Sequence, residues 1–385
     1  MGETTDEQFL RRAIRLAMSG RGRVEPNPMV GCVIVKKGRV IGEGYHAQYG
    51  GPHAEPNALA ACTESPAGAT VYVTLEPCCH TNKQTPPCAP RLIEAKVARI
   101  VVGCLDPNPD VNGNGVAMLR GAGIEVVGPV LEAPAKQLIA PFLARMQHRR
   151  PYVSLKWAES ANGKVAAAGG RPVQISNAVA TQFVHELRSR SDAIVVGVNT
   201  VLTDDPLLTA RCVANARNPS RFILDRDLRT PADARVIRDK SASATILHGF
   251  FNDAKKQHRR AGDFEQLGVH TALVPLDADG LLSLEKVTRR IFDAYCYEVL
   301  VEPGPTLARS FLAGGHADRF FLLRSEIHIP DDSAPAAASI PSHWVKVGEA
   351  DLGGDSVIEY LNSQSSVFFA AESSADLVLV GGAGA

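Results

Sequence analysis

The fold of the first part of this 385-residue chain is decided by three short stretches: His53-Ala54-Glu55, Pro77-Cys78-Cys79-His80 and Thr85-Pro86-Pro87-Cys88. One imidazole and two thiolates form a three-ligand zinc site, which leaves the fourth position of the metal open for water. A carboxylate that lies near the metal without binding it can move protons to and from that water. The stretches therefore predict a catalytic zinc site with His53, Cys78 and Cys88 as ligands and Glu55 as the proton shuttle.

A closed structural zinc site is the alternative interpretation. Such a site needs a fourth cysteine or histidine, and Cys79 or His80 supplies one. This alternative leaves Glu55 without a role. The order His-x-Glu, Pro-Cys and a later cysteine is also the signature of zinc-dependent nucleobase deaminases. We therefore favour hydrolytic deamination and keep the structural site open.

Strands and helices alternate around these stretches. Thr5 and Gln8 form a candidate capping box for a first helix, in which apolar residues up to Met18 recur at helical spacing. The expected strands cover 29–35, 39–43, 70–75, 99–103 and 124–127, and the expected helices cover 53–62, 89–95 and a short stretch at 118–119. This alternation predicts a three-layer α/β domain over 1–137. A linker over 138–151 follows, and we interpret its basic end as a solvated helix terminus.

A second α/β series follows the linker. Strands are expected at 152–157, 193–197, 221–224, 244–248, 270–274 and 298–302, and helices at 178–189, 284–294 and 306–313. After about residue 325 the patterns weaken to a loop and one last short strand at 376–380. Gly304-Pro305-Thr306 opens a helix directly after a strand, so its free backbone N–H groups favour an anion. Arg188 and Arg211 offer forked donors for a phosphate. We therefore expect a nucleotide-binding domain over 152–385.

Composition excludes several classes of protein. Lys+Arg and Asp+Glu both number 41, so the zero net charge argues against a broad nucleic-acid footprint. No stretch approaches the ~18 apolar residues of a membrane span, and the N-terminus has no basic segment followed by an apolar one. Eight cysteines are too sparse for a disulfide scaffold. We expect a soluble cytoplasmic protein that binds neither nucleic acid nor membrane.

Both halves of the chain resemble the bifunctional deaminase/reductase family of riboflavin biosynthesis. In the first half the resemblance rests on Pro26-Asn27-Pro28-Met29-Val30-Gly31, the zinc-site stretches, Asp106-Pro107-Asn108-Pro109 and Gly113-Asn114-Gly115. In the second half it rests on Lys156, Ser160 to Lys164, His185-Glu186-Leu187-Arg188, the run from Thr200 to Arg211, and Val301 to Leu307. The resemblance implies a cytidine-deaminase-like three-layer α/β/α domain followed by a dihydrofolate-reductase-like α/β domain.

The same resemblance implies a two-step function with one zinc ion per chain and NADPH as cofactors. The first step is hydrolytic deamination of 2,5-diamino-6-(5-phosphoribosylamino)pyrimidin-4(3H)-one, and the second is reduction of its ribosyl side chain to ribityl. The implied residues around the zinc site are Asn27, His46, His80 and Lys83 for the deaminase substrate. Those of the second domain are Ala158, Thr200, Asp204, Gly304, Pro305 and Thr306 for NADPH, and Arg188, Leu208, Arg211 and Glu302 for the reductase substrate. We also expect a homo-oligomer.

The second half departs from the family pattern at several positions. Pro172 and Gln174 stand where the family commonly has serine and tryptophan, and Arg226 replaces a small hydroxyl residue. One alternative is therefore a deaminase whose reductase-like domain only binds or scaffolds. A further alternative is a zinc-stabilised nucleotide-binding protein without catalysis. Editing of nucleic acid is disfavoured by the neutral charge.

Overall fold

The chain was analysed as a computed structural model, which describes residues 3–81, 85–171, 173–214, 216–250 and 254–369. It divides into two compact units, and the division falls between His148 and Arg149. The segment 138–151, which we expected to be a linker, is largely helical and lies mostly in the first unit. None of the helices within the described residues is long and apolar enough to cross a membrane.

The first unit is built on a five-stranded sheet in the order β2-β1-β3-β4-β5. The strands are β1 (Gly31–Lys36), β2 (Arg39–Tyr45), β3 (Thr70–Leu75), β4 (Arg99–Cys104) and β5 (Glu125–Val127). β1 is antiparallel to both β2 and β3, whereas β3, β4 and β5 are parallel. Parallel neighbours place the carboxyl ends of β3 and β4 at one edge of the sheet, and the loops that follow these two strands carry Cys78 and Asp106.

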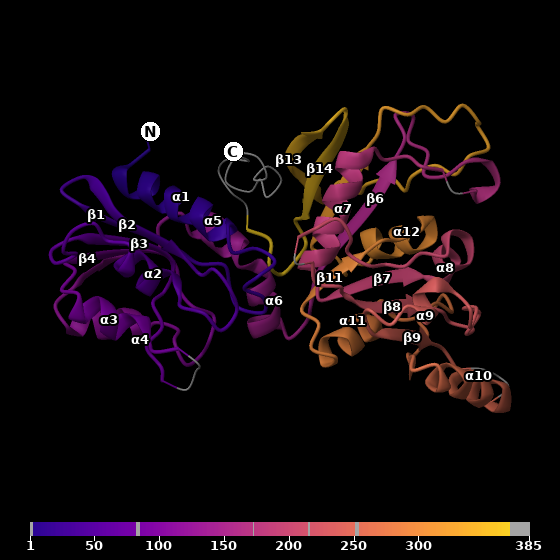
Figure 1. Ribbon diagram of the computed structural model, residues 1–385, viewed down its shortest axis with the longest axis horizontal. Coiled ribbons are helices and arrows are strands. Elements are labelled where there is room, and N and C mark those ends of the chain that lie inside the picture. The colour runs from indigo at the N-terminus through magenta and orange to yellow at the C-terminus, as the bar shows by residue number, and fades with distance from the viewer. Residues whose placement is uncertain (1–2, 82–84, 172, 215, 251–253, 370–385) are drawn as a thin grey trace. The chain divides into compact units, whose positions relative to one another are not determined.

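Helices cover both faces of this sheet, which confirms the three-layer α/β/α expectation. α1 (Thr5–Met18) and α5 (Glu132–Leu138) lie on one face, and α2 (Ala54–Ala60), α3 (Cys88–Glu94) and α4 (Asn114–Gly121) lie on the other (Figure 1). α6 (Ala140–His148) ends the unit. The capping box of α1 is formed by Thr4 and Glu7, one residue earlier than the expected Thr5 and Gln8.

The second unit contains a nine-stranded sheet in the order β10-β9-β8-β7-β11-β6-β12-β14-β13. Its parallel strands are β6 (Tyr152–Glu159), β7 (Ala193–Gly197), β8 (Ser220–Leu224), β9 (Ala244–His248), β10 (His270–Leu273), β11 (Glu298–Val301) and β12 (Arg319–Arg324). Only β13 (Trp344–Leu352) and β14 (Asp355–Asn362) run antiparallel to their neighbours. The parallel strands were expected apart from β12, and the antiparallel pair was not.

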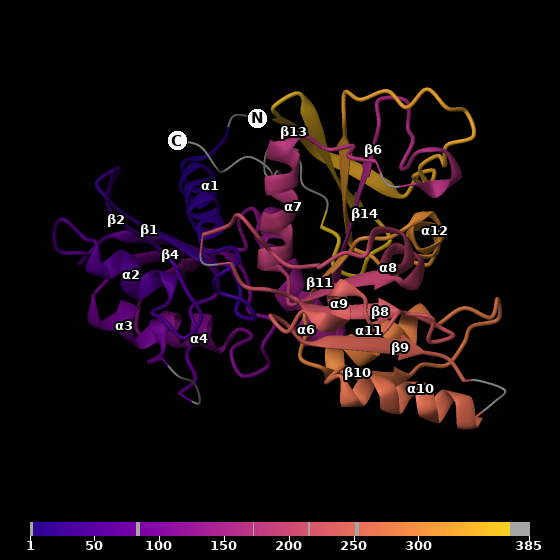
Figure 2. The ribbon, with the colours of Figure 1, turned by 45° about the vertical axis from the view of Figure 1, so that its right-hand side comes forward.

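Helices also cover both faces of the second sheet. α11 (Leu284–Asp293) and α12 (Pro305–Ala313) pack on one face through Val287, Ile291 and Phe311, which join the main core of the unit. α7 (Ala178–Arg190) contacts β11 and β14. The remaining helices are the 3-10 turn η1 (Ala168–Gly170), α8 (Val198–Asp204), α9 (Arg235–Arg238) and α10 (Ala254–Gln266). α10 runs beside the edge strand β10 (Figure 2).

The hairpin β13–β14 replaces the loop expected after residue 325. Its strand β14 buries three polar residues that a hydrophobic pattern does not reveal. Asp355 accepts a hydrogen bond from the Asn177 backbone N–H at 2.7 Å, Glu359 pairs with Arg319 at 3.1 Å, and the Asn362 amide donates to the Ala317 carbonyl at 2.8 Å. The last expected strand, 376–380, lies outside the described residues.

Candidate functional site

Three side chains from separate elements meet in the first unit. His53 is the N-cap residue of α2, Cys78 lies in the loop after β3, and Cys88 is the first residue of α3. The backbone N–H groups of Cys88 and Ala89 donate to the Cys78 carbonyl at 3.0 and 3.1 Å. These bonds tie the β3 loop to the start of α3 and thereby fix the separation of the two thiols.

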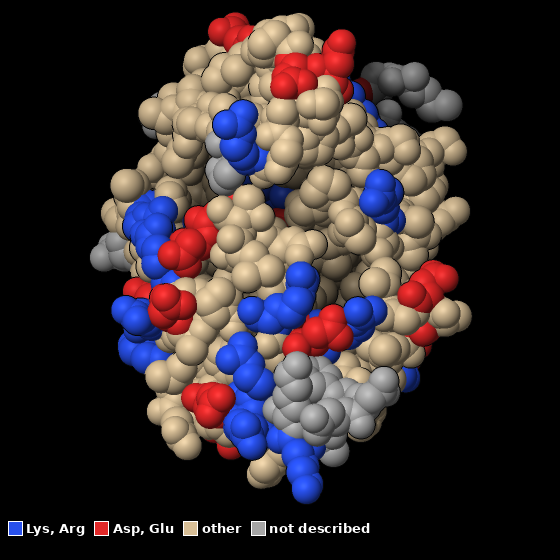
Figure 3. All heavy atoms as spheres, turned by 90° about the vertical axis from the view of Figure 1, so that its right-hand side faces the viewer, with Lys and Arg blue, Asp and Glu red and all other residues tan. Residues whose placement is uncertain are grey.

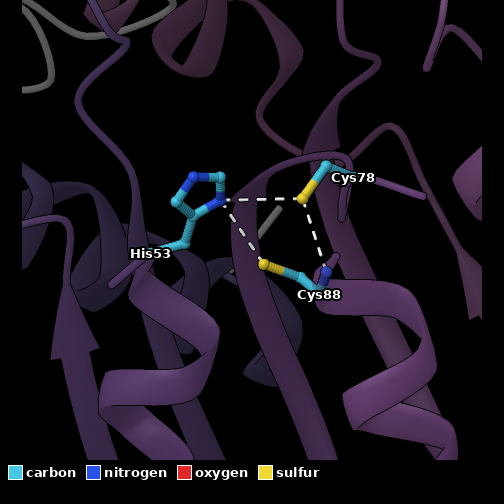
Figure 4. Close-up of side chains that lie close together, drawn as sticks. All are labelled: His53, Cys78 and Cys88. Carbon is cyan, nitrogen blue, oxygen red and sulfur yellow. Dashed lines mark hydrogen bonds between the residues drawn. The ribbon is translucent and has the colours of Figure 1, made fainter. Parts of the chain in front are cut away.

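The ligand atoms of these three residues form a compact cluster. The Nδ1 atom of His53 lies 3.6 Å from Cys78 Sγ and 3.4 Å from Cys88 Sγ (Figure 4). All three ligand atoms lie within 4.8 Å of one another. Thr85 Oγ1 lies 3.2 Å from His53 Nε2, the ring nitrogen that does not face the thiols. One imidazole nitrogen and two sulfur atoms at this spacing fit a zinc ion, and the hydroxyl contact helps to orient the ring.

Glu55 lies beside the cluster in the first turn of α2 and is only 3% exposed. Burial raises the pKa of its carboxyl group, and the neighbouring Cys78 thiol raises it further. A carboxyl group with a raised pKa can both accept and return a proton near neutral pH. Within the described residues the cluster of ligand atoms consists of His53, Cys78 and Cys88 and does not include Glu55, which is consistent with a proton shuttle that is not a ligand.

A cavity of about 380 Å³ opens over the metal cluster and Glu55. His46, Asn27 and His80 line it, and the contacts with substrate that the family resemblance implies for them stay a prediction. The His46 ring lies 5.3 Å from the His53 ring, and its Nε2 atom is 3.3 Å from Asn27 Nδ2. Burial lowers the pKa of His46, so the ring is neutral at physiological pH. Lys83 lies outside the described residues.

Glu76, which directly precedes Pro77 and to which we assigned no role, organises the wall of this cavity. Its buried carboxylate accepts the backbone N–H groups of Asp106 at 3.2 Å, Gly113 at 2.9 Å and Val116 at 3.0 Å. A Cβ atom at Gly115 would lie 2.1 Å from the Pro77 carbonyl oxygen, so this position needs glycine. Glu76 therefore joins the loop after β3 to the loop after β4.

The second unit holds two adjoining cavities of about 660 and 700 Å³. They share four lining residues, namely Asn199, Thr200, Gly304 and Pro305. Gly304 and Thr200 face each other where the two cavities meet. A Cβ atom at Gly304 would lie 3.8 Å from Thr200 Oγ1, so glycine keeps the space between them open. The turn opens α12, whose first N–H groups favour an anion. The two cavities therefore meet at the start of α12.

Arg188 and Glu302 form a bidentate ion pair in the first of these cavities. Arg188 Nε and Nη2 donate to the two carboxylate oxygens at 2.7 and 2.8 Å, and Nη1 donates to the Thr209 carbonyl at 3.3 Å. Burial alone would raise the pKa of Glu302, but the charge and hydrogen bonds of Arg188 lower it to about 2. Lys156 lines the same cavity, and burial lowers the pKa of its amine. Lys156 belonged to a quoted motif, but we had not assigned it to the site.

The other predicted residues of the second unit fall in different places. The cavity of about 660 Å³, which contains Arg188, is also lined by Ala158, Thr200, Asp204 and Arg211. Thr306 lines the adjoining cavity of about 700 Å³. Leu208 is 1% exposed, has φ 57° and is absent from the described lining of both cavities. Gln174 and Arg226, the departures from the family pattern, each line one cavity, and Pro172 lies outside the described residues.

The face of the molecule shown in Figure 3 carries no single dominant charge. Lysine and arginine side chains alternate with aspartate and glutamate over the face shown in Figure 3. This distribution agrees with the zero net charge of the chain.

Comparisons with known families match both units. The family described as the cytidine and deoxycytidylate deaminase zinc-binding region matches residues 3–104, and the RibD C-terminal domain family matches residues 151–325. Riboflavin biosynthesis protein RibD of Aquifex aeolicus is 38% identical over 82% of this chain and 85% of its own length. RibD of Actinobacillus pleuropneumoniae is 40% identical over 82% of each chain.

Solved structures give the same result. RibD of Acinetobacter baumannii superimposes with a TM-score of 0.77 at 34% identity, over 93% of this chain and 99% of that one. A diaminohydroxyphosphoribosylaminopyrimidine deaminase/5-amino-6-(5-phosphoribosylamino)uracil reductase from Thermotoga maritima gives 0.76 at 36% identity, over 93% and 98%. Relatives and solved structures match both units of the chain, and the first unit carries the His/Cys/Cys ligand set, so the chain belongs to the riboflavin biosynthesis RibD family.

Proposed function

We propose that this chain catalyses two consecutive steps of riboflavin biosynthesis, a hydrolytic deamination in the first unit and a reduction in the second. The substrate of the first step is the diaminopyrimidinone that carries a 5-phosphoribosylamino group. The observation that carries this proposal is the cavity in which His53, Cys78 and Cys88 converge beside the buried carboxyl group of Glu55. A closed structural zinc site would explain neither the cavity beside the ligands nor the buried carboxyl group of Glu55.

In the deaminase site, His53, Cys78 and Cys88 would hold zinc, which when bound supplies the Lewis acid that lowers the pKa of the attacking water. Glu55 accepts the proton of that water and passes it on to the pyrimidine ring and the departing ammonia. Its raised pKa suits both halves of this transfer. Neutral His46 and the Asn27 amide, 3.3 Å apart, are placed to bind the polar edge of the ring.

In the reductase site, Thr200, Gly304 and Pro305 would hold a nicotinamide cofactor, which when bound would supply the hydride for reduction at C1′ of the ribosyl group. Lys156 is the group best suited to deliver the accompanying proton, because burial lowers the pKa of its amine. Glu302 stays ionised and holds Arg188 in place. Arg211 directs its guanidinium into the cavity with one bond to Thr209 Oγ1 at 2.8 Å, and we assign the substrate phosphate to it. A phosphate role for Arg188 stays a prediction, since its Nε and Nη2 groups already donate to the Glu302 carboxylate.

We propose NADPH rather than NADH as the cofactor. Arg226 and Arg229 line the cavity of about 700 Å³, which shares Gly304 with its neighbour. Arg226 is already paired with the Asp227 carboxylate at 2.9 Å, whereas Arg229 donates to the neutral Asn199 Oδ1 at 2.8 Å. An additional phosphate on the adenosine ribose would therefore bind Arg229. We also propose a cytoplasmic location and a homo-oligomeric state; the eight cysteines, none of which forms a disulfide, suit a reducing compartment.

A two-step assay tests the proposed function. Purified chain with bound zinc is first given the diaminopyrimidinone phosphate, and ammonia is measured until its release stops. NADPH is then added, and its oxidation is followed at 340 nm. We expect about one ammonia and then about one NADPH consumed per substrate molecule, as the balanced reactions require.

Each alternative predicts a different outcome of the same assay. Ammonia release without NADPH oxidation would favour a deaminase with a scaffolding second unit. Zinc binding without ammonia release would reject the proposal in favour of a non-catalytic nucleotide-binding protein.

A further inference from the structure

Helix α6 contributes one wall of the deaminase cavity, although its sequence resembles none of the deaminase motifs. Phe142, Arg145 and Met146 of α6 line the cavity together with Asn27, His46 and Glu55. Residues three and four apart on a helix share one face, so these three side chains form a single surface of α6. The basic residue of this surface is flanked by two apolar ones.

Arg145 differs in charge from the other ionised groups of the cavity. Of the described residues that line it, Arg145 is the single lysine or arginine, whereas Glu55, Glu76 and Asp106 are acidic. Glu76 is saturated by three backbone N–H groups, and Asp106 accepts the Asn108 N–H at 2.8 Å. Among the described lining residues, Arg145 is therefore the cation that can bind a dianion.

A chain of contacts connects Arg145 to the metal-ligand end of the cavity. The His53 ring lies 5.3 Å from the His46 ring, His46 Nε2 lies 3.3 Å from Asn27 Nδ2, and Arg145 Nη1 donates to the carbonyl of the preceding Pro26 at 3.3 Å. A substrate whose reacting carbon is at the metal end would extend past His46 and Asn27 toward Arg145. Its phosphate is attached at the end most distant from that carbon.

We propose that Arg145 binds the 5′-phosphate of the deaminase substrate, an inference that rests on the proposed function. Arg145 Nη1 donates to the Pro26 carbonyl at 3.3 Å, and a guanidinium group presents five N–H donors in a planar arrangement suited to phosphate. Phe142 and Met146 line the cavity beside it, so apolar side chains flank the arginine. The arginine thereby selects the phosphorylated compound over its dephosphorylated form.

The test compares Arg145→Ala with the wild-type full-length chain on two substrates, the phosphorylated pyrimidinone and the same compound treated with phosphatase. We expect the KM for the phosphorylated substrate to rise about 10- to 100-fold with little change in kcat, the effect of losing charged hydrogen bonds. The KM for the dephosphorylated compound should stay unchanged. Inorganic phosphate should inhibit the wild-type enzyme competitively and the variant at least about tenfold more weakly.

Arg120→Ala is the matched control, because Arg120 of α4 also donates to a backbone carbonyl, that of Val126 at 3.2 Å, but lies outside the described lining of the cavity. It should leave both KM values unchanged. Zinc content is measured for every variant. If Arg145→Ala does not retain zinc, Arg145→Lys serves instead and should give an intermediate KM for the phosphorylated substrate alone.

The outcomes separate this inference from the proposed function. A wild-type chain that deaminates neither compound would reject both. A wild-type chain that deaminates, combined with an Arg145 variant whose KM rises equally for both compounds or for neither, would overturn the phosphate role and leave the deaminase intact.

Discussion

The ion pair between Arg188 and Glu302 should make a large, pH-dependent contribution to the stability of the second unit. Both side chains are largely shielded, with exposed fractions of 13% and 16%, and their two hydrogen bonds measure 2.7 and 2.8 Å. The pKa of Glu302 is lowered from 4.5 to about 2. At about 1.4 kcal/mol per pH unit, this corresponds to about 3 kcal/mol of stability at neutral pH.

Substitution Arg188→Met tests this magnitude, because it removes the charge while keeping much of the side-chain volume. Glu302 then becomes a buried carboxylate without its partner, and we expect the free energy of unfolding at pH 7 to fall by about 3 kcal/mol. Arg190→Met is the control on the same helix. Arg190 pairs with Glu186 at 3.2 Å in a more exposed position, so its loss should cost under about 0.5 kcal/mol.

The pH dependence has a definite sign. In the wild-type chain the lowered pKa of Glu302 stabilises the fold fully above pH 4.5, and this stabilisation is lost as the pH falls from 4.5 toward 2. In Arg188→Met, burial raises the pKa of Glu302 above its ordinary value, so protonation relieves the unpaired charge. The difference between the two proteins should therefore be large at pH 7 and shrink steadily below about pH 5.

Urea unfolding followed by tryptophan fluorescence isolates the relevant unit. The chain has two tryptophans, Trp157 and Trp344, and both lie in the core of the second unit. Adding Glu302→Gln to Arg188→Met should recover part of the lost stability, because no buried charge then remains. A difference that is under about 1 kcal/mol at pH 7, or that stays constant between pH 7 and pH 4, would refute this reasoning.

Three further predictions concern the two sites. Gly304→Val places a side chain where the two cavities of the second unit meet, so it should weaken NADPH binding at least about tenfold while deamination continues. Fluorescence titration measures this affinity, and an unchanged value would contradict the placement of NADPH across both cavities. Arg211→Ala should raise the reductase KM about 10- to 100-fold and leave ammonia release intact, and a change in both steps would argue against a phosphate role in the second unit. Cys88→Ser should lower the zinc content per chain measured by atomic absorption and abolish deamination, and full retention of zinc would contradict its role as a ligand.

The metal site was predictable because its chemistry is concentrated in short motifs. His53 and Glu55 are neighbours in sequence, and the two cysteines are joined by one loop, so local spacing indicated the cluster that the structure brings within 4.8 Å. The strands that carry these motifs were also predictable, because they are short apolar runs between turn residues. Their exact ends differed by one or two residues.

The hairpin β13–β14 escaped prediction for a physical reason. Strand β14 buries Asp355, Glu359 and Asn362, so its polar residues contradict the alternation that marks a half-exposed strand. Those residues are tolerated because partners distant in sequence satisfy them, such as Arg319 for Glu359. In β13 a register shift between Lys346 and Gly348 further disrupts the pattern.

The contribution of α6 to the deaminase cavity was equally invisible in the sequence. Arg145 lies 119 residues from Pro26, whose carbonyl it contacts, and no local pattern connects them. We interpreted the basic end of this segment as a solvated helix terminus, and that interpretation overlooked Arg145, which lies one turn earlier and lines the cavity. Sequence spacing identifies ligands that share a loop, but it does not identify a cavity wall supplied by a distant helix.

The most direct test of the central claim is the ammonia release of Glu55→Gln, measured together with its zinc content and its NADPH oxidation on the deaminated substrate. Glutamine matches glutamate in size but cannot carry the proton, so the account predicts about one zinc per chain, an intact reductase step and deamination slowed by at least about a thousandfold. A variant that keeps its zinc and still releases ammonia at the wild-type rate would contradict the account.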